Sequence, residues 1–155
     1  MLYLDASALV KRYSSERGSG AVLARFERDD KIFTSRLTFA EVHSTFGRKF
    51  RLGELNQQGL TRVREEFEND WLFSLSVLDL DVGTLSALPR LVEEYDLKAG
   101  DAIHLSAAFW LRDTIRRRRV RGQPEEPVEF GVSDLQLARI AKQCGLRVFN
   151  PEEET

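Results

Sequence analysis

The chain alternates between short apolar segments and longer segments in which apolar residues recur at helical spacing. The short segments predict strands at residues 2–4, 31–34, 72–80, 128–132 and 146–149. The longer segments predict a helix after residue 6 and further helices at residues 22–26, 37–50, 56–71, 82–95, 99–115 and 135–144. Strands separated by helices need crossover connections. The pattern therefore predicts an α/β fold in which helices cover both faces of a central, mainly parallel sheet.

Four acidic residues stand out because each interrupts or borders an apolar segment. Asp5 and Asp134 come shortly after predicted strands, Asp101 lies near the start of a predicted helix, and Glu41 lies inside a helix with no polar face around it. Ligands of parallel sheets bind beyond the carboxyl ends of the strands, so Asp5 and Asp134 are candidates for that crevice. Taken singly, Asp101 and Asp134 can also be helix caps. Together, the four favour a site, because a charge beside buried apolar residues needs a partner.

Size and charge narrow the class of protein. The 155 residues are close to the ~150 of a single domain, and 42% of them are hydrophobic, which supplies a core without disulfides or a structural metal. The 23 basic and 25 acidic residues leave a net charge of −2, so contact with phosphate must come from a local patch. The single cysteine, Cys144, excludes an intrachain disulfide and fits a reducing compartment. With no secretion signal and no long apolar run, we expect a cytoplasmic protein without membrane contact.

The sequence lacks the common motifs of nucleotide binding and of serine or zinc hydrolases. There is no glycine-rich dinucleotide motif, no P-loop, no GxSxG and no HExxH, and the chain has only two histidines. Carboxylate oxygens therefore remain as the candidate ligands, and clustered carboxylates repel one another unless a divalent cation lies between them. Mg²⁺ or Mn²⁺ suits such ligands better than Zn²⁺ does. Because such an ion activates water beside a phosphoryl group, phosphodiester hydrolysis is the natural chemistry.

The segments around the four acidic residues resemble a known family. The stretches at residues 4–11 (LDASALVK), 34–42 (TSRLTFAEV) and 101–108 (DAIHLSAA) are similar to three motifs of the PIN-domain ribonucleases, and within them of the VapC toxins of type II toxin–antitoxin systems. Asp134 leads through a helix to Gly145 and Asn150–Pro151, with spacing similar to the last acidic motif of that family. The resemblance covers nearly the whole chain, and the order and spacing of the motifs make it specific.

The resemblance implies a single three-layer α/β/α PIN-like domain at residues 1–151, followed by an acidic tail at residues 152–155. It implies Mg²⁺- or Mn²⁺-dependent cleavage of RNA, with Asp5, Glu41, Asp101 and Asp134 as catalytic metal ligands. It also implies a VapB-like antitoxin partner and a homodimer. Two departures from the family pattern stand out: Val132 occupies a place that usually holds Ser or Thr, and the connection from Arg116 to Pro127 is long.

Other residues are candidates for supporting roles. A hydroxyl at Ser7 or Ser133 can bond to a neighbouring carboxylate or cap a helix. His104 shares a helix face with Asp101, but a bond to the backbone is the commoner role of a helix histidine, so we leave it out of the catalytic set. Basic residues that either contact RNA phosphate or form solvated surface are Lys11, Arg12, Arg116, Arg117, Arg118, Arg119 and Arg121.

Two alternatives to an active ribonuclease remain open at this point. The chain can be a catalytically degenerate PIN-like module that keeps the acidic crevice for binding or regulation, as the altered last motif allows. It can also be a receiver-like domain that binds Mg²⁺ at its strand ends, which requires a phosphorylated aspartate and a suitably placed lysine. Cleavage assays with and without EDTA test the first alternative, and a small phosphodonor tests the second.

Overall fold

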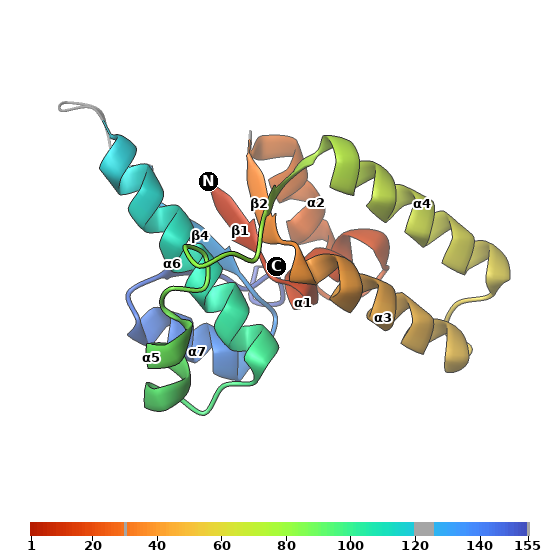
Figure 1. Ribbon diagram of the computed structural model, residues 1–155. Coiled ribbons are helices and arrows are strands. Elements are labelled where there is room, and N and C mark those ends of the chain that lie inside the picture. Colours follow the sequence, from red (N-terminus) through yellow and green to blue (C-terminus); the bar gives the residue numbers. More distant parts are fainter. Residues whose placement is uncertain (30, 120–125, 155) are drawn as a thin grey trace.

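The central element of the fold is a five-stranded sheet. The structure is a computed structural model and describes residues 1–29, 31–119 and 126–154. The strands are β1 (Leu2–Leu4), β2 (Ile32–Ser35), β3 (Leu75–Leu78), β4 (Glu129–Gly131) and β5 (Arg147–Phe149). They lie in the order β3-β2-β1-β4-β5, and neighbouring strands pair in parallel. The predicted parallel sheet is thus confirmed, with the first strand of the chain at its centre (Figure 1).

Helices connect the strands and cover the sheet. They are α1 (Ala6–Leu9), the 3₁₀ helix η1 (Val10–Tyr13), α2 (Ser19–Arg28), α3 (Leu37–Arg51), α4 (Gln57–Phe73), α5 (Leu88–Glu94), α6 (Ala99–Arg118) and α7 (Leu135–Gln143). Figure 1 shows α3 and α4 side by side, extending away from the sheet. Across the described part of the chain, no helix is both long and apolar enough to span a membrane.

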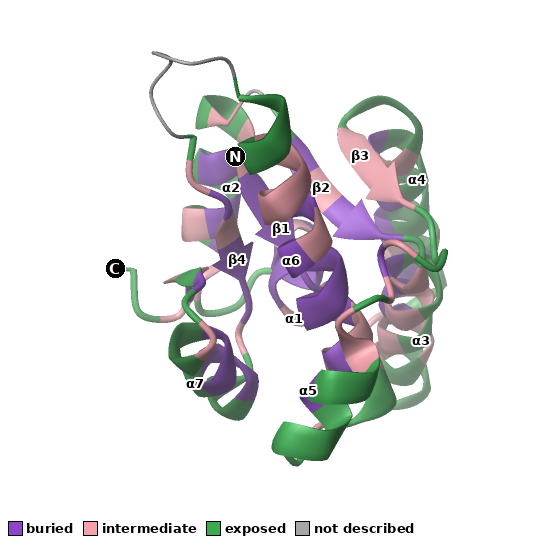
Figure 2. Ribbon diagram, turned by 60° about the vertical axis from the view of Figure 1, so that its left-hand side comes forward, coloured by how far each residue is buried: buried purple, intermediate pink, exposed green. Residues whose placement is uncertain are grey.

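Two hydrophobic cores lie on the two faces of the sheet because successive side chains of a strand point in opposite directions. Tyr3 belongs to the core under α5, α6 and α7, together with Phe130 of β4. Leu2 and Leu4 belong to the core under α1, η1, α2, α3 and α4. Figure 2 shows the buried central strands between these helices. The three-layer α/β/α prediction is therefore confirmed.

Two predicted boundaries, one on each side of β3, differ clearly from the structure. The predicted strand at residues 72–80 begins only at Leu75, because α4 continues through Phe73, whose side chain is exposed. A short apolar run has no clear periodicity, so its first residues were assigned to the wrong element. The predicted helix at residues 82–95 begins only at Leu88. The residues before it form a turn in which the Thr84 hydroxyl donates to the Asp79 carbonyl oxygen at 2.6 Å.

Candidate functional site

The four predicted acidic residues line one cleft at the carboxyl ends of the parallel strands. Asp5 follows β1, Glu41 lies on α3 after β2, Asp101 lies in the first turn of α6, and Asp134 precedes α7 after β4. The cleft encloses about 1030 Å³. Segments that are far apart in the sequence thus bring their carboxylates to one place, as the position of ligand sites in parallel sheets predicts.

Asp5 is the most deeply buried of the four carboxylates, with 4% of its surface exposed. It is the N-cap of α1, where its Oδ1 accepts from the Ala8 N–H at 2.9 Å and from the Ser7 hydroxyl at 2.8 Å. Burial raises the pKa of Asp5 to about 6, and the bonds from Ala8 and Ser7 and the nearby His104 only partly offset this rise. Glu41 raises it further. Asp5 is therefore held rigidly in a place that disfavours its negative charge.

Ser7 and Ser133 tie the first and last acidic segments together. The Ser7 hydroxyl donates to Asp5 and accepts from the Ser133 N–H at 2.9 Å. The Ser133 hydroxyl donates to the Ser7 carbonyl oxygen at 3.3 Å. The supporting role predicted for Ser7 thus has a direct contact with a carboxylate, whereas Ser133 acts on Ser7. Val132 is fully buried in the core, so a hydroxyl at that position would lie among apolar side chains.

Asp101 and Asp134 differ in their relation to the helix ends. Asp134 is exposed and is the N-cap of α7, with its Oδ1 accepting from the Leu137 N–H at 2.8 Å. Asp101 lies inside the first turn of α6, whose N-cap residue is Lys98, so a capping role does not explain Asp101. Burial raises the pKa of Asp101, and the Asp134 carboxylate raises it further, against smaller opposite effects of His104 and Lys98. Asp134 therefore combines a cap with a place in the cleft.

Glu41 has a buried histidine as its partner. His104 is 2% exposed, and its Nε2 lies 2.7 Å from Glu41 Oε2, while its Nδ1 lies 2.9 Å from the Tyr3 hydroxyl. The expectation of a backbone bond for His104 is thus wrong, because both ring nitrogens bond to side chains. Tyr3 was not predicted as part of the site. Its position within a buried strand was an available signal, because a buried tyrosine hydroxyl needs a partner.

A glycine next to Asp101 leaves room for the Glu41 carboxylate. A Cβ atom at Gly100 would lie 2.9 Å from Glu41 Oε1, which is closer than ordinary contacts allow. The absence of a side chain at this position therefore lets the start of α6 approach α3 at the cleft.

Two basic residues that were predicted near the first motif lie in ion pairs. Lys11 is 6% exposed, and its Nζ lies 2.8 Å from Glu152 Oε1 and donates to the Arg17 carbonyl oxygen at 3.0 Å. Glu152, the first residue of the predicted acidic tail, thus lies against the domain and lines the cleft. Arg12 pairs with the buried Asp70. The charges of Lys11 and Arg12 are therefore already engaged within the protein.

The predicted arginine run lies far from the acidic residues. Arg116–Arg118 form the last turn of α6, Arg119 follows it, and Arg121 lies outside the described residues. Asp101 lies in the first turn of the same helix. At a rise of 1.5 Å per residue, the run begins about 22 Å along the helix axis from Asp101. Figure 1 shows this end of α6 projecting away from the rest of the domain.

Two other basic residues line the acidic cleft itself. They are Arg48 on α3 and Lys98 at the start of α6, and both side chains are exposed. Neither was predicted from the sequence, because each is an isolated charge on a helix. Their spacing was an available signal, since Arg48 lies two helical turns beyond Glu41 and Lys98 lies just before Asp101.

The donor set is suited to a hard divalent cation, although the side chains are not arranged as a preformed site. Within the described residues, no three Asp, Glu, His or Cys side chains are grouped closely enough to hold a metal ion. The four carboxylates nevertheless line one cleft, and burial and mutual repulsion raise the pKa of Asp5 and Asp101. Mg²⁺ and Mn²⁺ prefer oxygen ligands and would relieve this repulsion. The residues therefore fit such an ion if the side chains converge on it.

Fold and cleft together define a three-layer α/β/α domain with acidic residues at the carboxyl ends of a parallel sheet. The family model described as "PIN domain" matches residues 2–117. The chain belongs to the PIN-domain family, as the sequence motifs predict.

Named relatives and solved structures agree with this assignment. The chain is 28% identical over 113 residues to Ribonuclease VapC45 and to Ribonuclease VapC49, both from Mycobacterium tuberculosis, a match that spans 73% of this chain and 78% of each relative. It is similar in fold to FitAcB from Neisseria gonorrhoeae, with a TM-score of 0.63, 17% identity and coverage of 97% of this chain and 98% of the other. A toxin–antitoxin complex from Klebsiella pneumoniae has a TM-score of 0.61, 18% identity and the same coverage.

Proposed function

We propose that the chain is a Mg²⁺- or Mn²⁺-dependent endoribonuclease of the VapC type. The observation that carries the proposal is the convergence of Asp5, Glu41, Asp101 and Asp134 on one cleft at the carboxyl ends of the strands. The relatives named Ribonuclease VapC support RNA as the substrate. The cleft favours an active enzyme over a degenerate binding module, because all four acidic residues of the family pattern are present in it.

The four carboxylates are the residues that would hold the ion. When bound, a divalent ion lowers the pKa of its water and balances the negative charge that develops on the scissile phosphate. The protein's own part is to fix the ligands: Ser7 and the Ala8 N–H orient Asp5, and the Leu137 N–H orients Asp134. A carboxylate of the cleft also accepts the proton that the attacking water loses.

A VapB-like antitoxin is the proposed protein partner. A solved structure with this fold is the toxin–antitoxin complex from Klebsiella pneumoniae, which supports a partner of that kind. An antitoxin segment that places an Arg or Lys among the carboxylates would replace the cation and block cleavage. A homodimer and a cytoplasmic location remain predictions from the sequence motifs and composition.

The proposed function predicts that purified protein cleaves RNA with Mn²⁺ and loses this activity in EDTA. The Asp101→Asn variant should lose at least about 100-fold in single-turnover rate, because it removes a ligand of the ion while keeping the size of the side chain. Sequencing of the RNA ends after brief expression in cells would locate the cut. Binding of RNA without cleavage in any metal would support the degenerate module instead, and phosphorylation by a small phosphodonor would support the receiver-like domain.

A second prediction concerns the basic residues that bind the RNA strand. Arg48→Gln and Lys98→Gln should each weaken RNA binding, because both side chains flank the carboxylates in the cleft. The logarithmic slope of affinity against salt should fall by about 0.7 for each phosphate group that the variant no longer binds. Affinity should be measured in the Asp101→Asn background, so that the RNA stays intact.

The same salt series tests the arginine run predicted from the sequence. The double variant Arg117→Gln/Arg118→Gln removes two charges at the far end of α6. If RNA is held mainly in the cleft, a short oligonucleotide should bind this variant like the parent protein. A decrease in affinity larger than that of Arg48→Gln would instead assign the main RNA contact to the arginine run.

A further inference from the structure

We propose that His104, anchored by Tyr3, is a positioning residue that fixes the orientation of the Glu41 carboxylate for the divalent ion. This inference rests on the proposed function, since it concerns the same cleft. It gives His104 and Tyr3 a role that neither the sequence motifs nor the four carboxylates explain.

The direction of the hydrogen bonds follows from the chemistry of the partners. An ionised carboxylate only accepts, so the His104 Nε2 that lies 2.7 Å from Glu41 Oε2 must carry a proton and donate it. The other ring nitrogen, Nδ1, lies 2.9 Å from the Tyr3 hydroxyl, which can both donate and accept a hydrogen bond. A continuous series of hydrogen bonds therefore links Tyr3 through His104 to Glu41.

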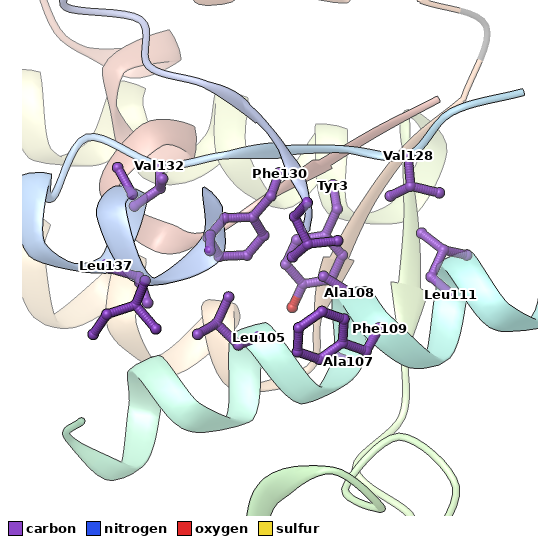
Figure 3. Packing of buried hydrophobic residues seen from close by; sticks show 14 of the residues in the cluster. Tyr3, Leu105, Ala107, Ala108, Phe109, Leu111, Val128, Phe130, Val132 and Leu137 are labelled. Carbon is purple, nitrogen blue, oxygen red and sulfur yellow. The ribbon is translucent and has the colours of Figure 1, made fainter. Parts of the chain in front are cut away.

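Tyr3, at which this series of hydrogen bonds begins, is held rigidly. Tyr3 is fully buried in the central strand, and its ring stacks on Phe130 with centroids 5.7 Å apart. It also meets the His104 ring edge-on, at a centroid distance of 6.0 Å. Figure 3 shows the Tyr3 ring packed among core side chains between β4 and α6, with its hydroxyl oxygen directed toward α6. The position of the imidazole is thus fixed by the core rather than by the surface of the cleft.

The series of hydrogen bonds ends at Glu41, the side chain that needs support. Glu41 is partly exposed, with 33% of its side chain accessible, and a glutamate loses rotamer freedom when it is held in one place. Asp5 and Asp134 are oriented by backbone N–H groups, but the bond that holds the Glu41 carboxylate comes from His104. Fixing Oε2 from the core side directs the other oxygen, Oε1, toward the space beside Gly100. Residues that orient metal ligands commonly contribute about 10- to 100-fold to metal affinity.

The test measures Mn²⁺ affinity by calorimetry on the whole protein without RNA. His104→Leu should weaken Mn²⁺ binding by about 10- to 100-fold, and His104→Gln should recover most of this loss, because its amide nitrogen can donate near the place of Nε2. Tyr3→Phe keeps the ring and should weaken binding by a smaller factor, on the order of threefold. In the Glu41→Gln background, His104→Leu should cause no further loss, because the bond it removes acts only through Glu41.

A matched control separates positioning from general stability. Ser106 lies on the same helix and is also buried, but its hydroxyl donates to the Thr84 carbonyl oxygen at 2.7 Å, outside the cleft. Ser106→Ala should lower the melting temperature and leave the Mn²⁺ affinity unchanged.

The possible failures are distinguishable. Unchanged Mn²⁺ affinity in both His104→Leu and Tyr3→Phe, with normal binding by the wild type, would overturn the positioning role and leave the nuclease intact. Equal losses in His104→Leu and His104→Gln would also overturn it. If His104→Leu does not fold, Tyr3→Phe decides: an Mn²⁺ affinity equal to that of the wild type would overturn the positioning role. A wild type that neither binds Mn²⁺ nor cleaves RNA would overturn the proposed function and this inference with it.

Discussion

Replacing Asp5 by asparagine is expected to abolish metal-dependent RNA cleavage and to raise the melting temperature of the metal-free protein at neutral pH. The asparagine oxygen can still accept from Ala8 and Ser7, so the cap of α1 is kept. The variant loses the negative charge that the buried site disfavours. With the pKa of Asp5 raised from 3.8 to about 6, the folded state gains at most about 3 kcal/mol.

The size of this gain depends on pH. Above pH about 6, Asp5 is ionised in both the folded and the unfolded chain, so the full cost of burying the charge is present in the wild type. Below pH about 4, it is protonated in both states, and the advantage of asparagine disappears. Thermal unfolding in EDTA at about pH 7.5 and about pH 4 checks this expectation. As a control, Asp96→Asn, at an exposed position, should leave the melting temperature unchanged at both pH values. A lower melting temperature of Asp5→Asn at both pH values would mean that Asp5 serves the fold alone.

Removing Asp70 is expected to cause a large loss of stability, although Asp70 lies outside the cleft. Asp70 is 4% exposed on α4 and accepts from Arg12 and, at 2.9 Å, from the Tyr13 hydroxyl. Asp70→Ala leaves both donors without this acceptor, which should cost about 3 kcal/mol. For a chain of this length, that corresponds to a melting temperature lower by roughly 6 to 12 °C.

Thermal unfolding of Asp70→Ala should be compared with Glu65→Ala, an exposed acidic residue on the same helix. Surface substitutions usually change stability by no more than about 0.5 kcal/mol. Because Asp70 joins α4 to η1, which also supplies Val10 and Lys11 to the cleft lining, its removal should loosen one wall of the cleft. Equal stability of the two variants would show that the Arg12 ion pair is no stronger than an exposed one.

The layout of the fold was predictable because it depends on local patterns. Short apolar runs indicate the strands, and apolar residues at spacings of three to four indicate the helices. Strands that alternate with helices leave little choice but a parallel sheet. The position of Asp5 and Asp134 after buried strands was enough to place them at one edge. Glu41 was predictable for a related reason, since a charge inside an apolar helix face needs a partner elsewhere.

The partners of individual side chains were less predictable, because they come from distant parts of the sequence. Nothing near Lys11 indicates that Glu152 will cover its charge, and nothing near Arg12 points to Asp70. The arginine run is conspicuous as a composition feature, but its relation to the site depends on the direction of α6 across the sheet. The role of His104 was not predictable from its own helix, because one of its partners is the buried hydroxyl of Tyr3 on a distant strand.

The place of β1 in the middle of the sheet has a consequence for the synthesis of the protein. This first strand pairs with β2 on one side and with β4, at Glu129–Gly131, on the other. In a growing chain, β1 and Asp5 are made before helices α1 to α6, whereas β4, which completes the pairing of β1, and Asp134 are made after them. Pairing over such a sequence separation forms late in folding. A nascent chain that ends before β4 therefore has neither a complete sheet nor a complete acidic cleft, so the proposed nuclease becomes active only after β4 and Asp134 have left the ribosome.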